Sequence, residues 1–198
     1  MFTGLIEEVG RVIGLEKQAE ASLLSAYAPK TAASCPIGSS VAVNGCCLTA
    51  VAISENQIEF HLLQETLFRT NLGDLQVGDH INCELPLLAN GRLGGHLVQG
   101  HIDCTARVLS SRYLGQDFWA EIEIPLAAAH YLIFKGSIAV NGVSLTVAKL
   151  KERSFAVCIT PYTHKCTNLG SLRAGMHINL EFDMVAKYVE RMRATRIY

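Results

Sequence analysis

The stretch AVNGVSLT at residues 139–146 repeats AVNGCCLT at residues 42–49, with six of the eight positions identical. A second pair has the same spacing of 97 positions: TNLGDLQVGDHINCE at 70–84 returns as TNLGSLRAGMHINLE at 167–181, with ten of fifteen positions identical. Because two matches share one offset, the sequence predicts a duplicated domain. Each copy is about twice as long as a typical solenoid or propeller repeat, so two independent modules are expected rather than an array.

The composition is that of a compact globular protein. Of 198 residues, 49% are hydrophobic and 18% are charged, and the formal net charge is −1. A net charge this small gives no electrostatic reason to expect nucleic acid. The basic residues Arg191, Arg193 and Arg196 form only a short tail, which is interpreted as a solvated helix end. We therefore expect no nucleic-acid partner.

The cysteines and the N-terminus indicate a compartment. Seven cysteines lack a C-x-x-C pair and any zinc-like spacing, and His96 and His101 have no cysteine partner nearby, so no metal is expected. The start Met1–Gly4 has no basic or apolar leader, and no apolar run approaches the roughly 18 residues that span a bilayer. We expect a cytoplasmic protein with reduced thiols and no membrane contact.

The first module is expected to consist of short strands. β-Branched residues are frequent, apolar and polar positions alternate, and turn residues such as Asn44-Gly45 and Ser54-Glu55-Asn56 separate the runs. This pattern predicts a small antiparallel barrel or sandwich. The expected elements are strands at 4–17 (with a bend near Gly10), 21–28, 41–53, 57–63 and 80–85, a loop containing Pro36 and Gly38, and a helical turn at 66–72.

The second module follows a glycine-rich linker at 90–95. Its start, Gly100-His101-Ile102, aligns with Gly4-Leu5-Ile6 at an offset of 96. Expected elements are strands at 118–124, 137–150 and 154–160, with a short helical excursion at 126–134.

A helix without a copy in the first half is expected after Asp183, which is placed as its N-cap. Its apolar residues follow helical spacing: Met184, Val185, Tyr188, Val189 and Met192. An amphipathic helix must bury its apolar face. Two interpretations stay open, packing on its own chain and packing on another subunit.

Duplicated β-modules favour two similar ligand sites, and the repeated NGxxLT segments are the best candidates to line them. A bend at Asn-Gly exposes backbone N–H and C=O groups, and the following residues add a small polar side chain and a Thr hydroxyl. That combination suits a flat heterocycle with amide-like edges. The plainer alternative is that Asn-Gly is only a turn and Leu-Thr only part of a strand.

The two copies differ at positions where two sites with different chemical roles would need different side chains. Cys47 aligns with Ser144, Leu5 with His101, and Gly38 with Lys135. Histidine moves protons near neutral pH, and a cysteine thiolate is a strong nucleophile. Each also has a structural alternative: Cys47 as a small buried strand residue, His101 as a core histidine, and Lys135 as a surface charge.

These residues belong to motifs through which nearly the whole chain resembles the riboflavin synthase alpha-subunit family. The motifs are the start MFTG, NGCCLT at 44–49, GGHLVQGH at 94–101, Lys135-Gly136, GVSLT at 142–146, and Asp183 with AKYVER at 186–191. Small departures from the family pattern occur at Gln99, Asn141, Gln64 and Tyr162, and they concern individual pocket contacts.

The resemblance implies an all-β fold of two tandem six-stranded Greek-key β-barrels and a C-terminal α-helix. The implied domains are 1–96, 97–183 and 184–198, the last for oligomerisation. The implied activity is a cofactor-free transfer of a four-carbon unit between two molecules of 6,7-dimethyl-8-ribityllumazine, which gives riboflavin and 5-amino-6-(ribitylamino)uracil. A homotrimer is implied, and lumazine synthase is a candidate partner on which the sequence does not decide.

The resemblance also implies site residues, assigned by matching position. The first-half site is expected to contain Gly4, Leu5, Ile6, Cys47, Leu48, Thr49, His61, Leu62, Leu63, Gln64, Glu65 and Thr66. The second-half site is expected to contain Gly100, His101, Ile102, Ser144, Leu145, Thr146, Cys158, Ile159, Thr160, Pro161, Tyr162 and Thr163. His96 is added as a binding residue, and Lys135 is expected to reach across to a neighbouring subunit.

The candidate catalytic residues are His101, Cys47, Ser144, Thr146, Asp183 and Phe2. The C7 methyl group of the lumazine is acidic because its carbanion delocalises into the ring, so a base of ordinary strength suffices. We hypothesise that His101 assists this proton transfer, that Cys47, Ser144 and Thr146 activate the heterocycle and water, and that Phe2 and Asp183 complete the pocket. The competing class is a non-catalytic lumazine- or flavin-binding antenna protein; a metal or redox protein is a third class.

Overall fold

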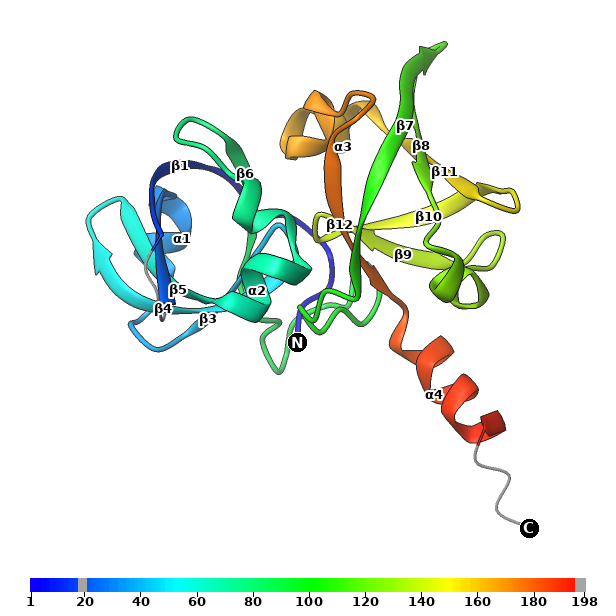
Figure 1. Ribbon diagram of the computed structural model, residues 1–198. Helices are drawn as coiled ribbons and strands as arrows, with labels where there is room; N and C mark the ends of the chain where they lie inside the picture. The colour runs from blue at the N-terminus through cyan, green and yellow to red at the C-terminus, as the bar shows by residue number, and fades with distance from the viewer. Residues whose placement is uncertain (18–20, 195–198) are drawn as a thin grey trace.

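The computed structural model describes residues 1–17 and 21–194, and it contains two closed antiparallel barrels side by side (Figure 1). The strands of the first barrel are joined in the order β1-β2-β5-β4-β3-β6. Its elements are β1 (Glu8–Glu16), β2 (Ala21–Tyr27), α1 (Pro29–Ser34), β3 (Ser40–Val43), β4 (Cys46–Ser54), β5 (Gln57–Leu63), α2 (Gln64–Arg69), the 3₁₀ helix η1 (Asn71–Asp74) and β6 (His80–Glu84).

The second barrel repeats this topology. Its strands follow the closed order β10-β11-β8-β7-β12-β9, which is the first order with six added to each label. Its elements are β7 (Cys104–Leu114), β8 (Asp117–Glu123), the 3₁₀ helix η2 (Leu126–Tyr131), β9 (Ser137–Val140), β10 (Val143–Leu150), β11 (Ser154–Ile159), α3 (Pro161–Cys166), the 3₁₀ helix η3 (Asn168–Ser171) and β12 (His177–Phe182). The prediction of two six-stranded barrels is confirmed.

Each barrel encloses its own apolar core, because alternate residues of every strand point inward. Leu24, Phe60 and Ile81 fill the first core, and Ile122, Phe155 and Leu180 fill the second; all six have 1% or less of their surface exposed. Each barrel is therefore a separate packing unit, and the two barrels are held together by residues outside these two cores.

Some local expectations were wrong. The segment 41–53 is not one strand but a hairpin of β3 and β4; the turn signal at Asn44-Gly45 is confirmed, with positive φ angles of 46° and 80°. The irregularity expected near Gly10 lies between Val12 and Gly14. Helix α1 occupies part of the expected loop, since Pro29 begins the helix rather than only ending a strand.

The sequence predicted that the two Asn-Gly turns expose backbone groups to a ligand, and this is wrong. The turns are buried against each other between the barrels. The Asn44 carbonyl accepts a hydrogen bond from the side chain of Asn179 at 2.9 Å, and the Asn141 carbonyl accepts one from Asn82 at 2.9 Å. A Cβ on Gly45 would lie 2.7 Å from the backbone nitrogen of Gly142. The turns hold the barrels together because buried polar groups need partners.

Helix α4 (Met184–Ala194) leaves the second barrel and points away from both barrels (Figure 1). The side chain of Asp183 accepts the backbone N–H of Val185 at 2.9 Å, which confirms the expected N-cap. Val185, Tyr188 and Met192 are all more than half exposed. Residues 195–198, and with them Arg196, lie outside the described residues. Among the described helices, none is long and apolar enough to cross a membrane.

Candidate functional site

The segment that precedes each barrel lies on the other barrel. The backbone N–H of Ser144, in the second barrel, donates to the carbonyl of Gly4 at 2.8 Å. The backbone N–H of Cys47, in the first barrel, donates to the carbonyl of Gly100 at 2.8 Å. Phe2 and Val98, which precede Gly4 and Gly100 in the two segments, form an antiparallel bridge with each other. The N-terminal segments of the two halves are therefore exchanged.

Core packing shows the same exchange. Ile6 packs against the core of the second barrel, and Ile102 packs against the core of the first. The expected grouping of Gly4–Ile6 with the first-half site and of Gly100–Ile102 with the second-half site is therefore wrong. His101 belongs to the segment on the Cys47 side, and Leu5 to the segment on the Ser144 side. Alignment of the copies could not show this, because it compares positions along the chain and not contacts in space.

Each exchanged segment is held by a buried glutamate of its own barrel. Glu84 accepts the backbone N–H of Thr3 at 2.7 Å and that of Gly4 at 3.1 Å. Glu181 accepts the N–H groups of residues 99, 100 and 101 at 2.6, 2.9 and 3.0 Å. Burial raises the pKa of both carboxyl groups, and the N–H donors oppose this by stabilising the charged form.

Glycine is required where the segments meet the opposite barrel. Gly4 and Gly100 have φ angles of 78° and 85°. A Cβ on Gly4 would lie 2.6 Å from the Cβ of Ser144, and a Cβ on Gly100 would lie 2.5 Å from the Cβ of Cys47. Any side chain at either position would therefore push the segment off the strand that it contacts.

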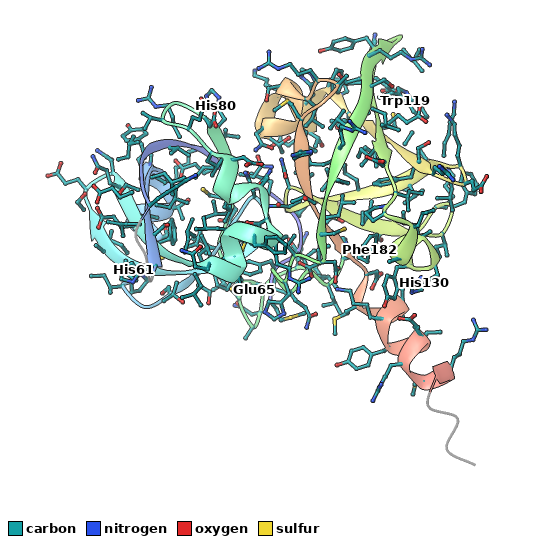
Figure 2. The ribbon with its side chains drawn as sticks, in the orientation of Figure 1. His61, Glu65, His80, Trp119, His130 and Phe182 are labelled. Carbon is teal, nitrogen blue, oxygen red and sulfur yellow. The ribbon has the colours of Figure 1, made fainter. Side chains whose placement is uncertain are left out.

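In the first barrel, strand alternation divides the candidate binding residues. Thr49 of β4 and His61 of β5 are exposed, Cys47 is half-buried, and Leu48 and Leu62 are part of the core. The side chains of Leu48 and Leu62 therefore cannot face a ligand outside the barrel, and this part of the prediction is corrected. Figure 2 shows His61 and Glu65 on the same edge of the first barrel, where β5 passes into α2.

In the second barrel, Ser144 is paired with His96, which directly follows the linker. Ser144 Oγ and His96 Nδ1 lie 2.6 Å apart. His96 is 9% exposed, and its Nε2 is buried without a hydrogen-bond partner in the described part of the chain. Burial lowers the pKa of His96, opposed by the negative charge of Asp183. A neutral imidazole bonded to a hydroxyl is an arrangement suited to proton transfer.

Thr146 lies two residues beyond Ser144 on β10, and the backbone N–H of Lys135 donates to the carbonyl of Val147 on the same strand at 2.9 Å. Thr146 is exposed on β10 and pairs with Ser137 of β9. Lys135 has a φ of 67°, a left-handed conformation that is unusual for a residue other than glycine, and its counterpart Gly38 has a φ of 86°. Backbone strain of this kind is often found at functional sites.

The remaining second-half candidates lie around α3. Thr160 caps this helix by accepting the N–H of Thr163 at 3.3 Å, and Pro161 and Tyr162 are exposed. Ile159 is fully buried in the core, so its side chain cannot contact a ligand, which corrects that assignment. Phe2 also has no exposed surface; it packs beneath Cys47 with Ala42, Val98 and Ala139.

A hollow of about 850 Å³ lies between α4 and the second barrel. Asp183 and Ser137 line it, and the sequence identified Asp183 alone as a site residue. The other lining residues are His130, Tyr131, Ile133, Gly136, Val185, Ala186, Val189, Glu190 and Arg193. Figure 2 shows His130 and Phe182 at this end of the barrel, where α4 begins. The helical spacing of Val185 and Val189 was the sequence signal that could have pointed to this hollow. It predicts that the helix packs against something, but it does not identify the surface or molecule on the other side.

Known relatives account for this duplicated arrangement. The family of the lumazine binding domain matches residues 3–86 and 99–183. The chain is 43% identical to riboflavin synthase of Actinobacillus pleuropneumoniae over 191 residues, 96% of this chain and 89% of that one. It is 43% identical to riboflavin synthase of Mycobacterium tuberculosis (strain ATCC 25618 / H37Rv) over 198 residues, 97% of this chain and 98% of that one.

Solved structures with bound ligands share the fold. LumP complexed with riboflavin matches with a TM-score of 0.87 at 26% identity, covering 92% of this chain and 99% of that one. LumP complexed with 6,7-dimethyl-8-(1'-D-ribityl) lumazine matches with a TM-score of 0.83 at 26% identity, covering 91% and 98%. From the family match and the extent of these similarities, the chain belongs to the riboflavin synthase family and carries two copies of its lumazine-binding domain.

Proposed function

We propose that this chain is a transferase that moves a four-carbon unit between two molecules of 6,7-dimethyl-8-ribityllumazine. One molecule loses C6, C7 and their methyl groups and becomes 5-amino-6-(ribitylamino)uracil, and the other gains these carbons and becomes riboflavin. Atoms balance between two substrates and two products, so the reaction needs no external oxidant, reductant or cofactor.

The observation that carries the proposal is the pair of similar but unequal sites. Each combines an NGxxLT strand with an exchanged segment held by a glutamate. Cys47 with the His101 segment forms one site, and Ser144 with His96 and the Leu5 segment forms the other. Two identical substrates that play opposite parts require such a scaffold, in which binding is repeated and the reactive groups differ.

The His96–Ser144 pair is the best-placed group for proton transfer. Its imidazole is neutral near pH 7 because burial lowers its pKa, and Ser144 Oγ can relay a proton to or from it. Asp183 stabilises the protonated imidazole by its charge. His101 remains a candidate for removing the C7 methyl proton, now assigned to the site on the first barrel. Holding two rings in contact would supply a further share of the rate.

We further propose a cytoplasmic homotrimer assembled through α4. The support is the apolar face of this helix, on which Val185, Tyr188, Val189 and Met192 are each at least half exposed. A reacting pair of sites would then form between the first barrel of one subunit and the second barrel of a neighbour, with Lys135 reaching across. An association with lumazine synthase remains a prediction from the family resemblance.

Incubation of the protein with 6,7-dimethyl-8-ribityllumazine tests the reaction. We expect riboflavin absorbance to rise and one molecule of riboflavin to form for every two molecules of lumazine consumed. Binding of the lumazine without any product would contradict the proposal and would favour the antenna-protein alternative. Heat-inactivated protein under the same conditions is the control for spontaneous conversion.

A further inference from the structure

Helix α4 contacts the second barrel through a charged pair. Lys187 Nζ, in the first turn of α4, lies 2.6 Å from Asp103 Oδ2, and the two side chains are only 26% and 27% exposed. The same Oδ2 atom accepts the backbone N–H of Phe182 at 2.8 Å. Asp103 therefore connects the end of β12 to the start of α4.

Asp103 also ends the exchanged segment that carries His101. The backbone N–H of Asp103 donates to the Leu180 carbonyl at 3.0 Å, and Glu181 holds the N–H groups of residues 99–101. The segment 99–103 is thus fixed to β12 at both ends. From β12 it extends to the first barrel, where Gly100 contacts Cys47 and Ile102 enters the core.

The first half has the same connection without the cation. Glu7 aligns with Asp103, and its Oε1 accepts the N–H of Leu85, the counterpart of Phe182, at 3.1 Å. Among the described residues, Glu7 takes part in no ion pair, and the chain continues from Leu85 into the linker rather than into a helix. The lysine and the helix are therefore features of the second half.

We propose that Lys187 is a positioning residue, which through Asp103 ties α4 to segment 99–103 and so fixes the place of His101 on the first barrel. The effect of this positioning on catalysis rests on the proposed function; the fixing of segment 99–103 does not. Its physical basis is that a half-buried ion pair, whose carboxylate oxygen also accepts a backbone N–H, has little freedom to move. The helix proposed for assembly would then also set the geometry of a site on the opposite barrel.

Lys187→Met tests this role because it keeps the length of the side chain and removes the charge. We expect amide hydrogen exchange of residues 99–103 to become at least tenfold faster and kcat to fall at least tenfold. Exchange of residues 3–7, held by Glu84, should not change. Lys187→Arg should restore both quantities, and Asp103→Asn, which keeps an acceptor for Phe182, should reproduce the loss.

The pH profile supplies a second readout. The charged or titratable groups that face Glu181 are Lys187 on α4, Asp103 before β7, and Cys46 on β4. Burial raises the pKa of Glu181 and Lys187 lowers it, so removal of the lysine raises it further. A protonated Glu181 holds its three N–H donors less well. The acid limb of the rate should therefore move to higher pH in Lys187→Met.

Lys149→Met is the matched control, because Lys149 lies over the ring of Trp119 on the outer face of the second barrel, at 5.1 Å from the centroid. It should leave exchange and kcat unchanged. Lys187→Met with unchanged exchange at 99–103, with equal acceleration at 3–7, or with wild-type kcat would each overturn the proposal. If the wild-type protein makes no riboflavin, the proposed function fails, while the exchange comparison still decides whether Lys187 fixes the segment.

Discussion

The two barrels share a scaffold and differ in the groups attached to it. Glu84 and Glu181 hold equivalent segments, and the turns at Asn44 and Asn141 are buried against each other in the same way. Beside the corresponding strands, however, the second barrel has a histidine–serine pair where the first has Cys47. Duplication has preserved the positions that build the sites and changed the positions that would carry chemistry.

The largest effect should follow from removing the histidine–serine pair. We expect Ser144→Ala and His96→Gln each to lower kcat by about 10²–10⁴-fold, the usual range for general acid–base groups. His80→Gln, on the opposite side of the first barrel from His61 in Figure 2, is the control and should keep wild-type kcat. Near-normal turnover in Ser144→Ala would remove the pair from the mechanism.

The pair also predicts a pH dependence. Burial lowers the pKa of His96 below its ordinary value of 6.5, so the imidazole stays neutral as the pH falls through that value. The midpoint of the acid decline in rate should therefore lie below pH 6.5. Measurement of kcat across this range checks the sign, and a decline that begins above pH 7 would show that another group limits the rate.

Loss of assembly should follow from removing the helix that the first half lacks. Deletion of residues 184–198 removes the exposed apolar face of α4, and sedimentation should then show a monomer. Val185→Glu with Val189→Glu should do the same in a full-length chain, with circular dichroism as the check that the barrels remain folded. A trimer that survives both changes would assign the helix to its own chain.

Smaller, nearly equal effects are expected where the halves agree. Glu84→Gln and Glu181→Gln each replace a carboxylate acceptor by an amide and should lower the free energy of unfolding by about 1–3 kcal/mol. Because the folded pKa of each carboxyl is raised, the folded state binds more protons, and stability falls as the pH rises from the unfolded to the folded pKa. Urea unfolding at several pH values should show a weaker dependence of the free energy of unfolding on pH in both variants. An effect in only one of the two variants would contradict the shared scaffold.

The smallest effect concerns the left-handed residue that differs between the halves. Lys135→Gly relieves backbone strain and should raise the free energy of unfolding by up to about 1 kcal/mol, while Gly38→Lys introduces strain and should lower it by a similar amount. Thermal unfolding should show a higher Tm for Lys135→Gly and a lower Tm for Gly38→Lys than for the wild-type protein. If Lys135 contacts substrate, the stabilised variant will also have a higher KM.

Local patterns in the sequence predicted most of the elements. Alternation located strands such as Gln57–Leu63, Asn-Gly located the turns, and Asp183 marked the start of α4. These signals depend on neighbours in the chain. Helix α1 was missed because Pro29 is equally compatible with the end of a strand and the first turn of a helix.

The site was predicted less completely, because its assembly is non-local. Alignment of the copies identified Cys47, Ser144 and His101, but not that Gly100 lies on the first barrel and Gly4 on the second. Nor could it place His96 beside Ser144, since His96 directly follows the linker and has no counterpart in the first half. Contacts between residues some 50 to 140 positions apart are set by how the barrels pack.

Ligand stoichiometry tests the central claim most directly, namely that one chain holds two similar sites for the same molecule. Ser144→Ala, in which turnover is expected to be at least about 100-fold slower, can be titrated with 6,7-dimethyl-8-ribityllumazine in a calorimeter with little conversion during the measurement. We predict two lumazine molecules bound per chain, with different affinities because the two sites differ in chemistry. A single bound molecule per chain would contradict the account.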